Sequence, residues 1–318
     1  MATLVFLEHH DGQIQKGSLG VLAKATQLGG DVVGALLGSG VRDLAAQAGE
    51  HGAATVYVVD DPALEAPLPQ PRVDALAAIV RDNGIENVLF AQSVLAADVA
   101  AGLAARLDAG LNWDLVDVTA DDGLTGKRPA LADSVFVDVG WTTTPRLALF
   151  RSGTFDPAPT GGSANVEDAS VSFEDFSTAA TMVEQAHAES GGPSIEDADV
   201  IVAGGRGLGA PEGFGLAEEL AKALGGAVGA TRAVVDAGWY PYAAQVGQTG
   251  KTVSPKLYVA LGISGAIQHK VGMQGANTIV AINKDPNAPI FEFSDLGVVG
   301  DLHQIVPKLA ELIRQRRG

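Results

Sequence analysis

Short runs of β-branched and other apolar residues alternate with Ala- and Leu-rich stretches from residue 1 to about residue 155. The short runs are typical of strands, and the Ala- and Leu-rich stretches favour helices. The predicted strands are Thr3–Leu7, Asp31–Leu37, Ala54–Val59 and Asn87–Ala91, and the predicted helices are Ser18–Leu28, Val41–His51, Pro71–Asn83 and Val94–Leu107. Alternation at this spacing predicts a parallel α/β sheet with right-handed crossovers.

Residues 111–156 have a different pattern, in which Val135–Val139 and Arg146–Phe150 are predicted strands separated by turns. We expect a β-rich extension of the first sheet there. A stretch rich in Pro, Gly and acidic residues follows, from Asp156 to Pro193, and its composition predicts a connector. The boundary is expected near residues 190–195, which gives an N-terminal α/β domain over residues 1–190 and a C-terminal domain over residues 195–318.

Strand and helix patterns alternate again beyond the connector. The predicted strands are Val200–Ala203, Ala227–Gly229, Leu257–Leu261, Thr278–Asn283 and Ile290–Phe293, and the predicted helices are Gly213–Leu224, Ala266–Met273 and Asp301–Arg317. Pro307 is expected to kink or restart the last helix, because proline lacks the N–H that a helix interior uses. The predicted fold class is α/β, with two domains that each hold a mostly parallel sheet flanked by helices.

The two predicted domains differ in charge. Residues 1–194 carry 10 Lys and Arg against 26 Asp and Glu, whereas residues 195–318 carry 11 against 12, within a total of −17. Nucleic acids and anionic lipids bind clustered Lys and Arg, so the acidic first domain argues against both as partners. The nearly neutral second domain is the better place for an anionic ligand.

The chain has no cysteine, which excludes disulfides, thiolate metal sites and thiol redox chemistry. Electron transfer would therefore need a bound cofactor. The start, Met1–Glu8, lacks the basic segment of a signal peptide, and no window of ~18 residues is uninterrupted and apolar. We expect a cytoplasmic protein without membrane insertion.

The segment Val200–Ala210 runs from the first strand of the second domain into a Gly-rich turn. Gly205–Ala210 matches the G-x-G-x-x-A pattern of dinucleotide-binding turns, but the next acidic candidate, Asp236, lies 31 residues after the first glycine rather than at the usual ~20. An ordinary Gly-rich turn explains the segment about equally well. Arg206 favours a phosphate contact, because a guanidinium can bind phosphate with two hydrogen bonds.

Two further segments carry polar residues. Thr231 and Arg232 follow a strand, and a helix cap with a solvated neighbour is the simpler interpretation. In Gln245–Val253, two amides and two hydroxyls stand among glycines, a composition that suits hydrogen bonding to a planar heterocycle. An ordinary polar turn also fits that segment.

The most informative segment is Leu257–His269, an apolar strand followed by a Gly-Ile-Ser-Gly turn and a helix start. A helix N-terminus has free N–H groups and a positive dipole end, which bind anions. His269 lies near the start of that helix, where a capped surface histidine is the alternative. Asn283 at a strand end and Asp301 before the last helix are ordinary caps by themselves.

Together these segments resemble the electron-transfer flavoprotein alpha family over about residues 198–310. The matching blocks are Ile201–Leu208, Gly229–Gly238, Gln245–Thr252, Leu257–His269, Thr278–Pro289 and Phe291–Val306. The first domain resembles the family only in its alternation and in Leu149–Phe155, where the family more usually has Pro-Gly. The resemblance implies that the second domain is an FAD-binding, Rossmann-like domain.

The resemblance also implies which residues bind FAD. Those at the pyrophosphate are Arg206, Thr231, Ser264 and the backbone of Gly265, Ala266, Ile267 and Gln268. Those at the flavin are Arg232, Gln245, Val246, Gly247, Gln248, Thr249 and His269. Those at the adenosine end are Asn283, Asp301 and Leu302. Thr249 would lie near flavin N5 and His269 near the N1–C2=O edge, where a donor or a cation favours negative charge on the reduced flavin.

The family's activity implies a partner subunit, an electron donor and an electron acceptor. The chain would be the alpha subunit of a heterodimer whose beta subunit packs against the first domain and binds AMP or a second FAD. Electrons would come from acyl-CoA or other dehydrogenases, as in fatty acid oxidation, and pass to an acceptor such as a quinone oxidoreductase. The chain would be an electron carrier without substrate turnover of its own. The acidic surface of the first domain either biases docking toward basic partners or is simply solvated.

Three alternatives remain open at this point. A nicotinamide-dependent oxidoreductase would use Gly205–Ala210, but it needs an acidic ribose contact that the sequence does not offer. A non-redox nucleotide sensor or scaffold would not need Arg232, Thr249 and His269 around a flavin. A bifurcating electron-transfer flavoprotein differs chiefly in what the beta subunit binds.

Overall fold

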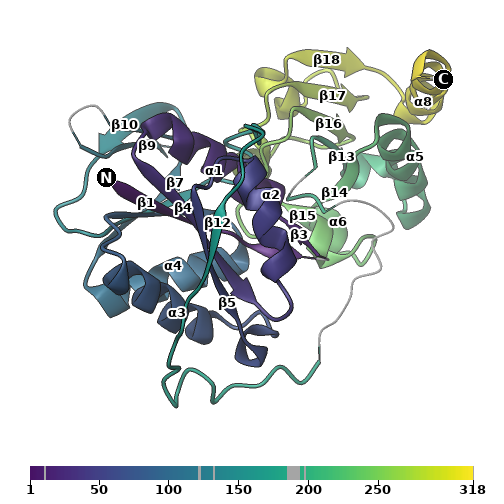
Figure 1. Cartoon of the computed structure of the whole chain (residues 1–318). Helices are drawn as coiled ribbons and strands as arrows, with labels where there is room; N and C mark the ends of the chain where they lie inside the picture. Colours follow the sequence, from purple (N-terminus) through teal and green to yellow (C-terminus); the bar gives the residue numbers. More distant parts are fainter. Residues whose placement is uncertain (11, 121–122, 132, 185–193, 197, 318) are drawn as a thin grey trace. The chain divides into compact units, whose positions relative to one another are not determined.

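The chain folds into two compact units, Met1–Gln185 and Ala186–Gly318. The computed structural model describes residues 1–10, 12–120, 123–131, 133–184, 194–196 and 198–317. Each unit has a parallel sheet flanked by helices (Figure 1), which confirms the predicted fold class. No helix in these ranges is both long and apolar enough to cross a membrane.

The first unit is built on a seven-stranded sheet with the order β12-β5-β4-β1-β6-β11-β7, in which every pairing is parallel. Its strands are β1 (Ala2–Phe6), β4 (Asp31–Gly38), β5 (Thr55–Asp60), β6 (Asn87–Ala91), β7 (Gly110–Leu115), β11 (Arg146–Phe150) and β12 (Asn165–Asp168). The first four predicted strands and Arg146–Phe150 are confirmed to within one residue at each end.

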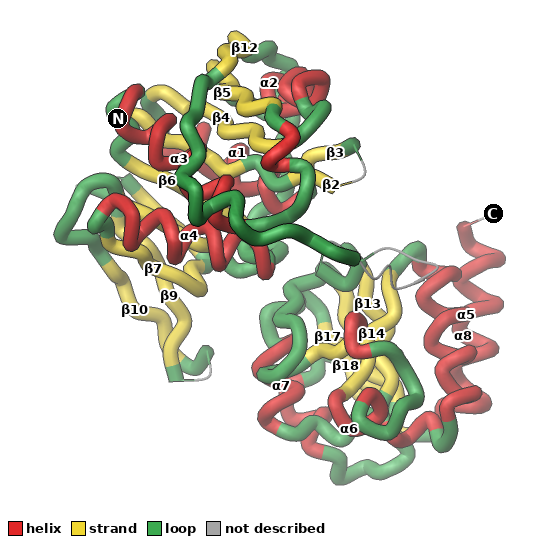
Figure 2. The backbone as a smooth tube through the Cα atoms, turned by 90° about the horizontal axis from the view of Figure 1, so that it is seen from below, coloured by secondary structure: helices red, strands yellow, loops and turns green. Residues whose placement is uncertain are grey.

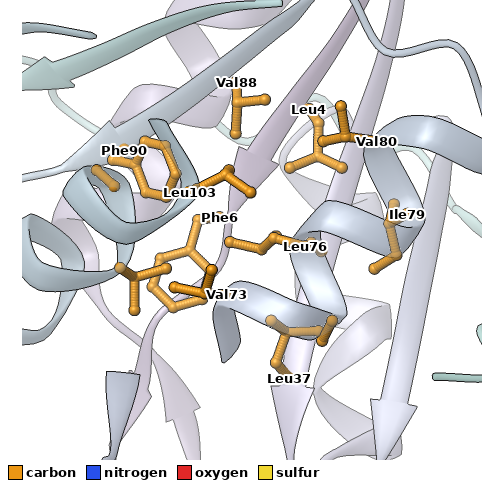
Figure 3. Close-up of a cluster of buried hydrophobic side chains, with 14 of the residues drawn as sticks. Leu4, Phe6, Leu37, Val73, Leu76, Ile79, Val80, Val88, Phe90 and Leu103 are labelled. Atoms are coloured by element: carbon orange, nitrogen blue, oxygen red, sulfur yellow. The ribbon is translucent and has the colours of Figure 1, made fainter. Parts of the chain in front are cut away.

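Two pairs of helices cover the two faces of this sheet. They are α1 (Lys16–Leu28), α2 (Ala45–Glu50), α3 (Pro69–Asp82) and α4 (Val94–Leu107), with 3-10 turns at Arg42–Leu44 and Pro62–Leu64. The faces of α3 and α4 pack on Phe6 and Phe90, whose ring centroids are 5.7 Å apart (Figure 3). Helices α1 and α2 pack on the opposite face. The predicted helix Val41–His51 is divided in the structure into the 3-10 turn Arg42–Leu44 and the α-helix α2.

The segment after α4 extends the first sheet only in part, through β7 and β11. Val135–Val139 does form a strand, β10, but it pairs antiparallel with β9 (Thr125–Ala130) in a separate sheet of order β10-β9-β8. The short β9–β10 connection returns the chain beside β9 and so keeps β10 away from β11. The third strand of this sheet is β8 (Asp117–Thr119), and a small ribbon elsewhere joins β2 (His9–His10) to β3 (Gln13–Ile14).

The predicted connector is structured over part of its length. Its strand β12 pairs with β5, and before it the N–H of Thr160 donates to the carbonyl of Glu50 at 2.7 Å. The first sheet therefore extends to Asp168, inside the segment expected to be a linker. Residues 185–193 of that segment lie outside the described part of the chain.

Arg151 ties three parts of the first unit together. Its guanidinium donates two hydrogen bonds to Asp114, at 2.8 and 3.0 Å, and two to Asp133, at 2.6 and 3.1 Å. Burial alone would lower the pKa of Arg151, but the bonds to both carboxylates outweigh it and raise that pKa. The ends of β7 and β11 and the β9–β10 turn are thereby held in one place.

The second unit is built on a six-stranded sheet with the order β15-β14-β13-β16-β17-β18, again parallel throughout. Its strands are β13 (Val200–Gly204), β14 (Ala227–Thr231), β15 (Gln245–Val246), β16 (Leu257–Leu261), β17 (Ile279–Asn283) and β18 (Leu296–Val299). The chain moves outward from β13 to β15, returns to β16 beside β13, and then moves outward on the other side. This winding creates a switch point between β13 and β16, where α/β proteins of this kind bind ligands.

Helices α5 (Phe214–Leu224) and α8 (Leu302–Arg317) lie side by side on one face of this sheet (Figure 2). Helix α7 (Ile267–Met273) packs on the other face, and α6 (Arg232–Val235) follows β14. The remaining turns are the 3-10 segments Arg206–Leu208, Pro211–Gly213, Tyr242–Ala244 and Pro289–Phe293.

One sequence-based expectation for the second unit is wrong. The predicted strand Ile290–Phe293 is a 3-10 turn, because Pro289 begins it and has no N–H for a sheet. The edge strand is instead β18. Helix α8 runs through Pro307 as one element rather than restarting there, with Leu302, Val306 and Ala310 buried along one side.

Candidate functional site

The predicted site residues of the second unit follow the carboxyl ends of its strands. Gly204 pairs in register with Ala230 and Leu261, and Asn283 pairs with Val299. Since the strands are parallel and their ends are level, the segments that follow them meet at one edge of the sheet.

Two glycine turns meet backbone to backbone at the switch point. The N–H of Gly205 donates to the carbonyl of Leu261, and that of Gly207 donates to the carbonyl of Gly262, each at 2.9 Å. A Cβ atom on Gly205 would lie 2.6 Å from the Gly262 oxygen, and one on Gly207 would lie 2.5 Å from the Gly262 Cα. Side chains at these positions would separate the turns, so the glycines keep them together.

The two arginines beside these turns are exposed, and Thr231 is partly buried. Arg206 is exposed, and its guanidinium has no hydrogen bond or ion pair with the described residues. Thr231 occupies the N-cap position of α6, but within the described chain its side chain makes no cap hydrogen bond, so the simple capping interpretation is incomplete. Arg232 is 66% exposed and donates to Asp236 at 3.1 Å.

The turn after β16 is held from β17 and from the 3-10 segment. The Asn283 side-chain amide donates to the carbonyl of Ile263 at 2.9 Å, and the N–H of Ile290 donates to the carbonyl of Ser264 at 3.0 Å. Gly265 has a φ of 91° and stands so close to Ile290 that a Cβ atom would lie 2.3 Å from its nitrogen. Asn283 therefore does more than cap a strand, because its side chain fixes the neighbouring turn.

This turn leaves a row of backbone donors unpaired. After Ser264, the first N–H with an acceptor among the described residues is that of His269, which donates to the carbonyl of Ala266 at 2.9 Å. The N–H groups of Gly265–Gln268 have no acceptor within the described part of the chain. Four neighbouring donors at a helix start suit the oxygens of a phosphate.

The loop after β15 has an internal support. The buried side chain of Gln245 donates to the carbonyl and the hydroxyl of Thr249, at 3.1 and 3.3 Å. The Tyr242 hydroxyl donates to the same carbonyl at 3.0 Å. Gln248 and Thr249 are exposed, whereas Val246 and Gly247 are buried. Gln245 thus shapes the loop, and the two residues after Gly247 have side chains available for a ligand.

His269 is buried, with 6% of its surface exposed, so the capped surface histidine is the wrong interpretation. Its Nδ1 lies 3.0 Å from the carbonyl oxygen of Val246, and its Nε2 lies 3.0 Å from the hydroxyl of Tyr258. Burial lowers the pKa of His269 to about 4, against the raising effect of the Val246 hydrogen bond. At neutral pH the side chain therefore supplies no positive charge.

The last two predicted contacts lie at the start of α8. The Asp301 carboxylate accepts the N–H of His303 at 2.9 Å and so caps the helix, as expected. Leu302 is 5% exposed and belongs to the core, which leaves only its backbone for a ligand. No group of three or more His, Asp and Glu residues within the described ranges could hold a metal ion.

Two tyrosines that support the site were missed by the sequence interpretation. Tyr258 lies within an apolar strand and is fully buried, and Tyr242 is exposed before the loop. A tyrosine inside an apolar strand carries a usable signal, because its buried hydroxyl needs a partner. Tyr242 carries no such signal, since its partner is a backbone carbonyl.

This edge, with its switch point and its two glycine turns, is typical of α/β proteins that bind dinucleotides. Residues 3–174 match the family model described as "Electron transfer flavoprotein domain", and residues 194–274 match "Electron transfer flavoprotein FAD-binding domain". The chain belongs to the electron transfer flavoprotein alpha subunit family.

Relatives named "Electron transfer flavoprotein subunit alpha" match along nearly the whole chain. The one from Thermoanaerobacterium thermosaccharolyticum is 38% identical over 98% of this chain and 97% of its own length. The one from Mycobacterium tuberculosis is 40% identical over 99% of both chains. "Protein FixB" of Clostridium saccharobutylicum is 39% identical over 96% of this chain and 94% of its own.

Proposed function

We propose that this chain binds FAD at the carboxyl edge of its second sheet and carries electrons between proteins as one half of a heterodimer. The observation that supports this most is the switch point, where two glycine turns lie beside the amides of Gly265–Gln268, which have no acceptor among the described residues. A row of N–H groups and a guanidinium suit a pyrophosphate, which every dinucleotide has. The residues present therefore fit FAD.

The chain's own groups have distinct roles in this proposal. Arg206, Thr231 and Ser264 bind the pyrophosphate together with the open amides. Gln248 and Thr249 contact the flavin from the loop after β15, and Arg232 adds positive charge near the ring. Asn283 and the carboxylate of Asp301 contact the adenosine end.

Bound FAD would supply the redox chemistry, because a flavin accepts electron pairs and releases single electrons. The protein groups bind and orient it and stabilise negative charge as it is reduced. We infer that the partner subunit is an electron transfer flavoprotein beta subunit holding AMP or a second FAD. Acyl-CoA or other dehydrogenases would give electrons, and a quinone oxidoreductase would accept them. The chain would then have no substrate turnover of its own.

The test is to co-express the chain with its beta subunit, purify the complex and measure its flavin spectrum, flavin count and nucleotide content. One FAD and one AMP per heterodimer are expected for a simple carrier. Two FAD molecules would instead assign the complex to the bifurcating type. A colourless complex that takes up no added FAD would overturn the proposal, and tight binding of NAD with dehydrogenase turnover would support the nicotinamide alternative.

A further inference from the structure

The 246–251 loop carries Thr249 and is closed at its base by Lys251. The N–H of Lys251 donates to the carbonyl of Gln245 at 2.7 Å, and the Lys251 carbonyl accepts the N–H of Gly247 at 3.1 Å. These two backbone hydrogen bonds cross between the start and the end of the loop. The position of the loop therefore depends on where Lys251 is held.

The side chain of Lys251 reaches a distant part of the same unit. Its Nζ donates to the Glu196 carboxylate at 3.0 Å, and about a third of each side chain is exposed. Glu196 lies 55 residues earlier in the chain, in the segment Ser194–Glu196 that precedes β13. The ion pair therefore joins the base of the loop to the segment that leads into the second sheet.

The backbone around Glu196 is held in place by its neighbours. Ile195 is 5% exposed and lies in the same core cluster as Val246. The N–H of Glu196 donates to the Ser194 hydroxyl at 3.3 Å, and the N–H of Ala198 donates to the Ser194 carbonyl at 3.1 Å. The carboxylate of Glu196 is therefore presented to the loop from backbone that is packed against the core.

We propose that Lys251 and Glu196 are positioning residues of the FAD site, which fasten the 246–251 loop to the segment before β13. This inference rests on the proposed function, in which the loop presents Gln248 and Thr249 to the flavin. Lys251 acts through the backbone that it closes, because its ammonium group is paired with Glu196. Since the pair is partly exposed, its effect is modest and decreases with added salt.

The first test needs no FAD and uses the full chain in its complex with the beta subunit. Hydrogen exchange at the Gly247 amide, whose acceptor is the Lys251 carbonyl, reports whether the base of the loop is closed. Lys251→Met and Glu196→Gln should each make this exchange about threefold faster. The double variant should exchange no faster than either single variant, because all three lack the same pair. In ~1 M salt the wild-type rate should approach theirs.

The pair between Lys256 and Asp199 provides the matched control. Its atoms are 3.7 Å apart, and it joins the residue before β16 to the residue before β13, outside the loop. Lys256→Met and Asp199→Asn should therefore leave exchange at the Gly247 amide as in wild type. Reversing the proposed pair, with Lys251→Glu and Glu196→Lys together, should slow the exchange again toward the wild-type rate.

A second test separates positioning from a direct effect of the lysine charge on the flavin. If the pair positions the loop, Lys251→Met and Glu196→Gln should both lower FAD affinity, each by about threefold, and shift the flavin reduction potential in the same direction. A lysine acting directly on the flavin would give opposite signs, because Glu196→Gln removes a carboxylate that competes for the ammonium group.

Unchanged exchange at the Gly247 amide in both Lys251→Met and Glu196→Gln would overturn the positioning role, whatever the FAD result. Opposite shifts of the flavin potential in the two variants would also overturn it. Failure of the wild-type complex to bind FAD would defeat the proposed function, and that outcome is distinguishable because the exchange measurements need no flavin.

Discussion

Gly207 and Gly262 lie in direct backbone contact, with the N–H of the first donating to the carbonyl of the second at 2.9 Å. One follows β13 and the other follows β16, so the contact joins the two strands on either side of the switch point. The position of Arg206 relative to the amides after Ser264 depends on this contact.

Gly207→Ala should therefore weaken FAD binding and also lower the free energy of unfolding of the second unit. The added Cβ would lie 2.5 Å from backbone rather than from a flexible side chain, so the turns must separate. We expect a loss of about 1–3 kcal/mol in unfolding free energy and at least ~10-fold weaker FAD binding. Denaturant unfolding and FAD titration measure the two effects.

Gly215→Ala is the control for this change. Gly215 lies in α5, where a Cβ atom meets nothing within 4 Å. Alanine favours a helix over glycine by about 0.5–1 kcal/mol, so this variant should be as stable as wild type or more so. A Gly207→Ala protein that binds FAD normally would mean that the contact between the turns does not shape the site.

Arg206→Ala should lower FAD affinity without lowering stability. The side chain is exposed and unpaired among the described residues, so its removal breaks no bond within them. Loss of a charge-assisted bond to phosphate predicts binding weaker by about 10- to 100-fold, with less salt dependence. Arg314→Ala, which removes an exposed pair with Glu219, should leave the titration unchanged. An Arg206→Ala protein with wild-type affinity would place the pyrophosphate elsewhere.

Arg232→Ala tests the charge beside the flavin. Its pair with Asp236 is exposed on both sides, so we expect a stability change below about 0.5 kcal/mol. FAD affinity or the flavin reduction potential should fall, because a positive charge near the reduced ring is lost. Asp236→Asn breaks the same pair but keeps the arginine. If both variants behaved alike in reductive titration, Arg232 would have no role at the flavin.

The sequence predicted the second sheet well because its strands are short, apolar and followed by glycine or polar turns. Leu257–Leu261 is recovered with both ends correct, and the segments after each strand gather as the parallel order requires. The same local signals failed where long-range pairing decides the outcome. β10 has the composition of a sheet strand, but its partner β9 placed it in a separate antiparallel sheet.

The gathering of the candidate site residues at one edge of the sheet could be predicted, but their internal contacts could not. The strand–turn–helix pattern of Leu257–His269 placed His269 near the start of a helix. Nothing in the local sequence indicates that its ring points inward to Tyr258 and Val246. Which way a side chain points depends on the packing of α7 against the sheet. Tertiary contacts of this kind have no sequence period, so the burial and neutrality of His269 could not be predicted.

Arg151→Lys should destabilise the first unit. Lysine cannot make the four hydrogen bonds that the guanidinium shares between Asp114 and Asp133, and it leaves largely buried carboxylates partly unpaired. A loss of about 2–3 kcal/mol is expected in denaturant unfolding. Arg42→Lys is the control, because its pair with Asp168 is exposed and should contribute less than about 1 kcal/mol. Equal effects of the two substitutions would contradict a central role for Arg151.

The buried, neutral His269 predicts how the second unit responds to acid. Its pKa is lowered from 6.5 to about 4 by burial, although the hydrogen bond to Val246 opposes the shift. Between these two values the unfolded chain binds the proton and the folded chain does not. The contribution of His269 to the free energy of unfolding is thus complete above pH 6.5. It falls as the pH drops toward 4, by about 3 kcal/mol in all.

Tryptophan fluorescence can isolate this effect, because Trp239 belongs to the second unit while Trp113 and Trp141 belong to the first. In a protein with Trp113→Phe and Trp141→Phe, unfolding followed at Trp239 should show stability that decreases from pH 6.5 to 4. Adding His269→Gln should flatten the slope, since a glutamine does not titrate. His9 also has a lowered pKa, chiefly from burial, but it lies in the first unit, so His9→Gln should leave the Trp239 slope unchanged. A slope that survived His269→Gln would show that another group carries the acid sensitivity.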